Sequence, residues 1–224
     1  MMRPLALALV LMAGPAGAAE TMLRLTAEAE VARAPDLVTL SGGVSTTAPG
    51  AAAAMAENAA AMRRVVAAVA AAGVAARDIQ TEGLSLQPQY DYSDRKATLT
   101  GYQARNMVRL RLRDVDRVGA LIDAMVKAGA NQISGPVFAI EKADAALDEA
   151  RRAAVAKARA RAALYAEAAG LKLVRIASIS ESGGQMPEPR PMLRMAADSV
   201  AESTPVAPGE VAMVAGVTME FVLE

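Results

Sequence analysis

The chain of 224 residues has no cysteine, histidine or tryptophan, and it has only two phenylalanines and four tyrosines. Without cysteine it has no disulfide framework. Because histidine is absent as well, the chain cannot build the usual catalytic pairs of a nucleophile and a base. It also cannot build zinc sites of thiolate or imidazole ligands. Carboxylate chemistry, lysine chemistry or a hard-metal site remains, but the acidic residues are scattered along the sequence. We therefore expect a protein that is not an enzyme and that has no cofactor.

The first nineteen residues have the composition of a secretory signal peptide. Arg3 precedes an apolar run from Leu5 to Met12, and small residues follow. This pattern predicts export, with cleavage after Ala18 or Ala19. The apolar run is shorter than the ~20 residues that span a bilayer, and no later stretch qualifies as a transmembrane segment. In a bacterium with two membranes, the mature protein is expected in the periplasm.

The predicted mature chain, residues 20–224, is nearly neutral, with 23 basic and 24 acidic residues. A nucleic-acid-binding protein usually has a basic balance, so no nucleic-acid partner is expected. About 205 residues can bury a full core without covalent cross-links. We treat residues 20–224 as one domain, with a first half at 36–140 and a second half at 141–224.

Hydrophobic periodicity predicts alternating strands and helices. Strands are expected at 23–31, 38–44, 79–90, 99–113, 132–140, 173–180 and 211–223, and helices at 51–72, 115–126 and 144–169. Glycines 73, 129 and 170 are expected to end the helices in a left-handed conformation. Residues 36–140 then have the order β-α-β-β-α-β, which is the split βαβ or ferredoxin-like arrangement. We predict an α+β fold in which this sheet and its two helices are extended by a long helix and further antiparallel strands.

Local side-chain chemistry predicts where several elements end. The residues from Ser45 to Gly50 are expected to end the second strand, and Asp114 to cap the helix after it. Asp148 is expected to support the long helix with Arg152, four residues later. Residues 182–209 are rich in proline, glycine and serine and have no period, which predicts a mobile loop.

Two groups of side chains are candidate sites. Met186, Met192 and Met195 lie in the predicted loop, and thioethers suit the soft ion Cu(I); the alternative is that these methionines are simply tolerated in an exposed loop. Tyr90 and Tyr92 lie at the tip of the predicted hairpin, where aromatic residues often mark a protein contact. Local packing is the alternative for the tyrosines.

A row of arginines, Arg109, Arg111 and Arg113, alternates with aliphatic residues along one predicted strand. The aliphatic residues are expected under the helices and the arginines on the open face of the sheet. The row is a candidate interaction surface, and an ordinary solvated face is the alternative. The strand at 211–223 is interpreted as apolar on both sides, which predicts cover on both faces by the second half of the chain or by another subunit.

Several segments resemble the SIMPL-domain family of exported bacterial proteins, which includes periplasmic immunogenic antigens and oxidative-stress defence proteins. They include TLSGGVSTTAPGAAAAMAENAAAM, DIQTEGLSLQPQYDY, LTGYQARNMVRLRLRDVDRVGALIDAMVKAGANQISGPVFAI and VAPGEVAMVAGVTMEFVL. The resemblance runs from about Leu23 to the C-terminus. It implies a periplasmic α+β protein that is linked to stress tolerance and has no recognised catalytic residues, and oligomeric assembly fits the family.

Two hypotheses from different classes follow. The preferred one is a non-enzymatic periplasmic interaction protein that assembles with itself, with a possible envelope protein partner, and supports envelope or oxidative-stress tolerance. The alternative is a protein that binds Cu(I) or a small ligand through the loop with Met186, Met192 and Met195.

Overall fold

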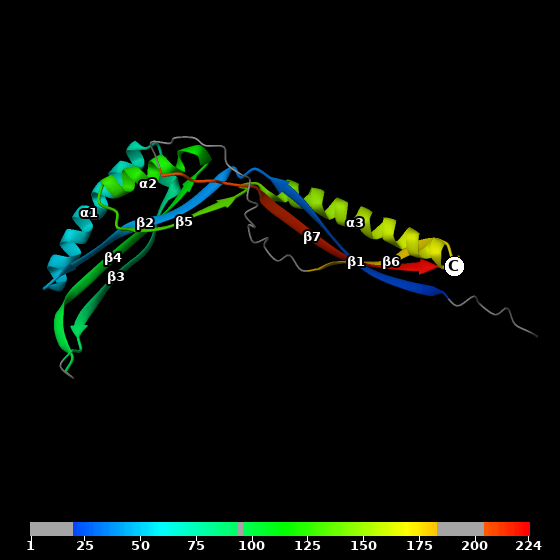
Figure 1. Cartoon of the computed structure of the whole chain (residues 1–224), viewed down its shortest axis with the longest axis horizontal. Coiled ribbons are helices and arrows are strands. Elements are labelled where there is room, and N and C mark those ends of the chain that lie inside the picture. Colours follow the sequence, from blue (N-terminus) through cyan, green and yellow to red (C-terminus); the bar gives the residue numbers. More distant parts are fainter. Residues whose placement is uncertain (1–19, 94–95, 183–203) are drawn as a thin grey trace, which may run out of the picture. The chain divides into compact units, whose positions relative to one another are not determined.

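The computed structural model describes residues 20–93, 96–182 and 204–224. They form helices and antiparallel sheets, which confirms the α+β class (Figure 1). The chain divides into two compact units. The described parts of the larger unit are residues 30–93, 96–147 and 204–213, and those of the smaller unit are residues 20–29, 148–182 and 214–224. The predicted signal peptide and Met186, Met192 and Met195 lie outside the described residues.

The larger unit contains a four-stranded sheet with the order β3-β4-β2-β5. Its strands are β2 (Leu37–Ala48), β3 (Ile79–Asp91), β4 (Thr98–Leu112) and β5 (Gln132–Ala139). The helices α1 (Ala51–Ala71) and α2 (Val118–Lys127) lie on the same side of this sheet (Figure 1). Short 3-10 turns, η1 (Ala76–Asp78) and η2 (Val115–Arg117), precede β3 and α2. The element order is the predicted β-α-β-β-α-β series, and the finer ferredoxin-like label stays a prediction.

The core of this unit lies between the sheet and the helices. Leu110 of β4 faces Leu40 of β2 in the register, and both are fully buried. They pack in one cluster with Val65 and Val69 of α1 and with Met125 of α2. Because side chains alternate along a strand, the arginines of β4 lie on the opposite, exposed face, as predicted.

The three glycines predicted to end helices all have positive φ: 93° at Gly73, 106° at Gly129 and 68° at Gly170. In this region a side chain clashes with the backbone, so glycine is the residue that ends these helices without strain. The predicted helix ends are therefore confirmed.

The predicted end of the second strand at Ser45 is wrong. β2 continues to Ala48, which pairs with Tyr102 of β4. Asn131 explains why Ser45 stays in the strand: its Oδ1 accepts the backbone N–H of Ser45 at 2.7 Å and its Nδ2 donates to the Ser45 carbonyl at 2.8 Å. A distant side chain thus satisfies the backbone that local composition predicted to turn.

Two further local predictions are wrong. Asp114 precedes η2 but makes no side-chain capping hydrogen bond, and its backbone carbonyl accepts the N–H of Arg117 instead. Asp148 pairs with Arg151, at 2.9 Å and a spacing of three, rather than with Arg152. Arg151 also binds Glu181 on a neighbouring strand at 2.8 Å, which draws its side chain to that side of the helix.

A second sheet has the order β1-β7-β6 and is built from β1 (Thr21–Arg33), β6 (Leu173–Ser182) and β7 (Val211–Leu223), of which residues 21–29, 173–182 and 214–223 belong to the smaller unit. The long helix α3 (Ala143–Ala168) packs on it through alanines four residues apart, which are Ala154, Ala158, Ala162 and Ala166. They contact Met219 and Phe221 of β7, which are fully buried. The small methyl groups leave room for these larger side chains.

The interpretation of β7 as apolar on both sides is wrong for the middle of the strand. Thr218 lies 3.0 Å from Thr26 of β1, oxygen to oxygen. Glu220 accepts hydrogen bonds from Arg24 at 2.5 and 2.9 Å and from the Ser178 hydroxyl at 2.7 Å. These polar contacts across three strands suit a face in contact with water, so β7 does not require apolar cover on both sides.

Candidate functional site

The arginine row of β4 is held by acidic residues of the same unit. Arg113 binds Glu141 at 2.6 Å and Asp78 at 2.9 Å. Arg111 lies 3.7 Å from Glu141, and Arg109 pairs with Glu82 of β3. The structure therefore places the three arginines on one surface, as predicted, but each has a carboxylate beside it.

These pairs keep the groups charged. The Ser41 hydroxyl and then Arg109 lower the pKa of Glu82 by hydrogen bonding to its carboxylate. Arg113, and more weakly Arg111, lower the pKa of Glu141. In return, Glu141 and then Asp78 raise the pKa of Arg113. Each of these shifts favours the charged form of Glu82, Glu141 or Arg113.

Glu82 reaches Arg109 because of an irregularity in β3. Thr81 pairs with Val108 and Gly83 with Met107, so Glu82 is an extra residue between two successive pairs of the ladder. Such a bulge re-aims a side chain and is often marked by glycine. Sequence reasoning missed Glu82, and the available signal was Gly83 inside an otherwise regular strand.

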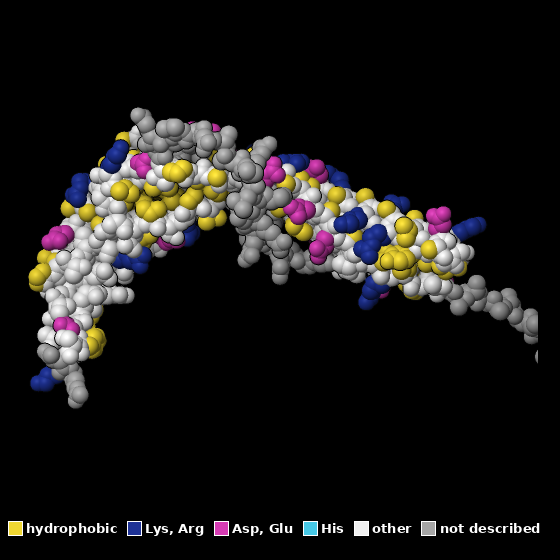
Figure 2. Space-filling model, viewed as in Figure 1, with side chains coloured by type: hydrophobic (Ala, Val, Ile, Leu, Met, Phe, Trp, Pro, Cys, Tyr) yellow, Lys and Arg dark blue, Asp and Glu magenta, His cyan; other side chains and the backbone are white. Residues whose placement is uncertain are grey.

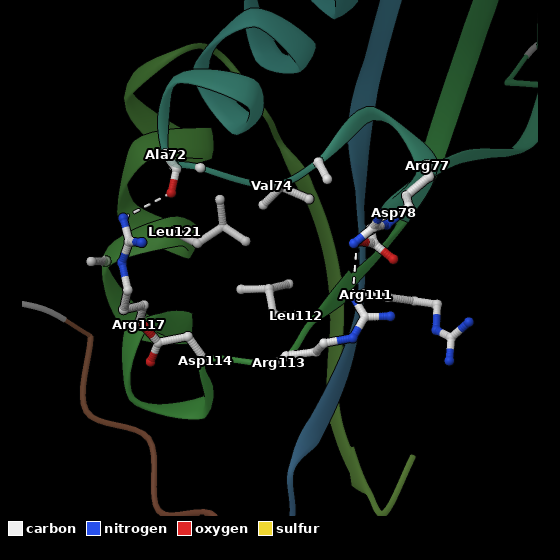
Figure 3. A pocket seen from close by; sticks show the side chains of 13 residues that line it. Ala72, Val74, Arg77, Asp78, Arg111, Leu112, Arg113, Asp114, Arg117 and Leu121 are labelled. Carbon is white, nitrogen blue, oxygen red and sulfur yellow. Dashed lines mark hydrogen bonds and ion pairs between the residues drawn. The ribbon is translucent and has the colours of Figure 1, made fainter. Parts of the chain in front are cut away.

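A pocket of about 310 Å³ lies beside the end of this row. Its lining comes from the connection between α1 and β3, the end of β4 and the start of α2 (Figure 3). Val74, Leu112 and Leu121 form an apolar centre. The charged lining residues are Arg77, Arg111, Arg113 and Arg117, with Asp78 and Asp114.

No motif in the sequence indicates this pocket. Its lining residues fall in two stretches, 72–78 and 111–121, and only the fold of the sheet brings them together. Arg117 anchors one side, since it donates a hydrogen bond of 2.8 Å to the carbonyl of Ala72 at the end of α1. On the other side, Arg113 bonds to Asp78 of η1 (Figure 3).

A second hollow, of about 410 Å³, lies on the open face of the sheet. Its lining includes Ser41, Glu82, Ser85, Arg105 and Ser134. Its floor is the sheet itself, and two of its polar groups already contact each other, because the Ser41 side chain hydrogen-bonds to Glu82.

The far end of the β3–β4 hairpin carries the two predicted tyrosines. The ring centroids of Tyr90 and Tyr92 are 6.3 Å apart, and the residues are 46% and 70% exposed. Hydrophobic side chains appear in this part of the hairpin in Figure 2. The rings pack on each other and still offer a surface, so the choice between partner contact and local packing stays open.

No metal site is found among residues 20–93, 96–182 and 204–224, where no three acidic side chains gather closely enough to hold an ion. The proposed Cu(I) ligands Met186, Met192 and Met195 lie outside these ranges. None of the described helices is both long and apolar enough to cross a membrane.

The fold defines an α+β protein with a helix-covered, four-stranded antiparallel sheet. The chain belongs to the SIMPL family, described as proteins of unknown function (DUF541), whose model matches residues 23–221. This confirms the resemblance found in the sequence.

Curated relatives cover most of the chain. The 26 kDa periplasmic immunogenic protein of Brucella melitensis is 34% identical over 200 residues, which span 84% of this chain and 79% of the relative. The uncharacterized protein YggE of Escherichia coli K12 is 32% identical over 167 residues, or 75% and 68% of the two chains. YggE of Edwardsiella ictaluri is 28% identical over 178 residues, or 79% and 74%.

Proposed function

We propose that this chain is a non-enzymatic periplasmic protein that assembles with copies of itself and supports envelope or oxidative-stress tolerance. The periplasmic location is supported by the signal-peptide pattern of residues 1–19 and by the name of the Brucella relative. The stress role is carried by the resemblance to the family.

The observation that carries the assembly proposal is the edge strand β3. It lies at one end of the sheet order and has 13 residues, and almost all of it is exposed. Leu84 is 56% exposed, and Leu86 and Tyr90 of the same strand are each at least 40% exposed. A long edge with exposed apolar side chains is a template for pairing with another chain, which monomeric proteins usually avoid.

A second copy fits this edge for a geometric reason. An antiparallel strand edge is complementary to itself across a two-fold axis, so two β3 strands can pair through one patch on each subunit. Pro88 has no N–H to contribute to such a ladder, which limits backbone pairing to the part of β3 before it. The hairpin end, with Tyr90 and Tyr92, is then left to make side-chain contacts.

The first test is the mass of residues 20–224 by light scattering during gel filtration, at low and high salt. We expect a discrete multiple of the subunit mass. The double variant Leu84→Glu, Leu86→Glu should dissociate it, because buried like charges oppose pairing of the apolar strip. Gln87→Glu adds charge to the same strand and should leave the assembly intact. Dissociation by salt alone would implicate the arginine row.

A monomer under both salt conditions overturns the assembly proposal, as does equal dissociation by Gln87→Glu. For the stress role, a strain that lacks the protein should lose peroxide tolerance. It should regain tolerance with the wild-type gene but not with the dissociated double variant. Equal rescue by both would separate stress tolerance from assembly.

A further inference from the structure

We infer that the pocket between η1, the end of β4 and α2 binds a small amphiphilic anion, a carboxylate or phosphate group on a short apolar body. This site is independent of the proposed assembly through β3. Its volume of about 310 Å³ is at the small end of the ~300–1,000 Å³ typical of ligand sites. A short body, rather than a folded peptide or a nucleic acid, is the matching size.

The apolar half of the site comes from three aliphatic side chains. Val74, Leu112 and Leu121 meet at the centre of the pocket (Figure 3). Leu112 and Leu121 are 8% and 3% exposed, so packing already fixes their positions. Val74 is only partly buried, so the apolar surface that an alkyl or aryl body can cover here comes mainly from this side chain.

The cationic half follows from how the arginines are paired. Arg113 holds both Asp78 and Glu141, so these two carboxylates are already committed. Within the described chain, Arg77 reaches Asp78 and Arg111 reaches Glu141 only at 3.7 Å, beyond a good hydrogen bond. Both side chains are exposed and keep donors for a ligand, and they point away from the apolar centre, so they lie at the rim of the pocket (Figure 3).

Arg117 adds a third donor group from the other side of the pocket. Arg117 donates its hydrogen bond to a neutral acceptor, the Ala72 carbonyl, so this contact does not cancel its charge. The pocket lining has four arginines and two acidic residues, Asp78 and Asp114, and Glu141 lies beside it as a third acid. The site therefore has an excess of one positive charge. A monoanion balances this excess.

These two halves together define the ligand class. Guanidinium groups bind carboxylate and phosphate through paired hydrogen bonds, which a hydroxyl group cannot reproduce. An inorganic anion alone would cover apolar side chains with a strongly hydrated ion, which is unfavourable. A cation would meet the excess positive charge. An anionic head with an apolar tail satisfies both halves of the site.

The test is an NMR titration of the ¹⁵N-labelled protein with sodium octanoate, and with octan-1-ol and inorganic phosphate as comparison ligands. Octanoate should shift the amide signals of Gly73, Val74 and Leu121 in a saturable way. The alcohol and inorganic phosphate should bind at least about tenfold more weakly, since each engages half of the site.

Variants separate the pocket from general charge effects. Arg77→Gln combined with Arg111→Gln should weaken octanoate at least about tenfold. Arg105→Gln is the matched control, because Arg105 lies on the same strand face as Arg111 and lines the other hollow. It should bind octanoate as the wild type does, and circular dichroism should confirm that all variants are folded.

The inference is overturned if octanoate gives no saturable shifts, if octanol binds equally well, or if Arg105→Gln weakens binding as much as the double variant. A competition arm identifies the source of the anion. If phosphatidylglycerol vesicles displace octanoate and phosphatidylcholine vesicles do not, the natural ligand is a lipid. If neither displaces it while octanoate binds, the ligand is a soluble amphiphile. Both results support the anion site.

Discussion

Replacement of Asn58 tests how the larger unit joins its helix to its sheet. Asn58 lies on α1 and is 1% exposed. Its Nδ2 donates to the carbonyl of Val44 on β2 at 2.9 Å and to that of Ala104 on β4 at 3.0 Å. One amide group thus bonds two neighbouring strands to the helix above them.

The magnitude for Asn58→Ala follows from counting these groups. Each buried carbonyl left without its partner costs about 1–3 kcal/mol. The Oδ1 of Asn58 is buried without a partner among the described residues, so its removal returns about 1 kcal/mol. For two carbonyls, we expect a net loss of about 1–5 kcal/mol in the free energy of unfolding. With a urea slope of about 2 kcal/mol per M, the midpoint should fall by about 0.5–2.5 M.

Asn58→Asp should be destabilised in a pH-dependent way. The carboxylate would face two carbonyl oxygens, so burial and repulsion should raise the pKa of the folded state above the unfolded value of about 3.9. The folded variant then holds a proton that the unfolded chain has released. Its stability should therefore fall as pH rises above about 4, by about 1.4 kcal/mol per pH unit, until the raised pKa is reached.

The assay is urea unfolding, followed by circular dichroism between pH 3 and pH 7. Ala56→Asp is the control, because Ala56 is exposed on the same helix. It should change stability by less than about 0.5 kcal/mol, because surface substitutions are usually mild. If Asn58→Asp and Ala56→Asp show the same pH dependence, or if Asn58→Ala unfolds at the wild-type midpoint, the buried amide does not join the layers.

Three further changes test other parts of the structure. Phe221→Ala removes a fully buried ring from the smaller unit and should cost about 3–5 kcal/mol in thermal unfolding; a loss below 1 kcal/mol would contradict this core. Gly43→Ala would place a methyl group against the backbone carbonyl of Asn106, so we expect a lower melting temperature and displaced amide signals in β2 and β4; an unchanged spectrum would refute the close approach. Arg113 lowers the pKa of Glu141 in the folded state, so this pair stabilises the fold at pH values above the pKa that Glu141 has in the unfolded chain. The stabilisation is lost as the pH falls through the lowered pKa. Glu141→Gln should therefore flatten this part of the acid-unfolding curve, and a curve identical to that of the wild type would count against the pair.

The periodicity of apolar residues was sufficient to predict most of the helices and strands, because each of these elements is encoded by the residues within it. The alternation in β4 placed Leu110 inside and Arg109 outside, and both assignments agree with the structure. Gly73 and Gly129 ended their helices as predicted because the left-handed conformation is a local property. Where one residue's own chemistry decides the outcome, the sequence was enough.

The predictions failed where a distant residue decides. Ser45 stays in β2 because Asn131, 86 residues later, binds its backbone. The error on β7 is of another kind, because Thr218 and Glu220 stand in the strand itself and make one face polar; only the partner of Glu220, Arg24, is distant, 196 residues earlier in the sequence. Neither partner can be chosen from spacing alone. The pocket was missed for the same reason, since its two lining stretches have no shared pattern.

The arginine row shows how pairing divides one surface into two roles. Arg113 connects Asp78 of η1 to Glu141, and Glu141 in turn donates its backbone N–H to Asp36 at 2.6 Å. This end of the row therefore fixes the connections around the sheet, and it leaves little charge for a partner. Arg111 has only the longer ion pair of 3.7 Å within the described chain, and it lines the pocket. In this row of alternating arginines, Arg113 thus holds the fold, while Arg111 is available to a ligand. The positions of the acidic residues decide which arginine has which role.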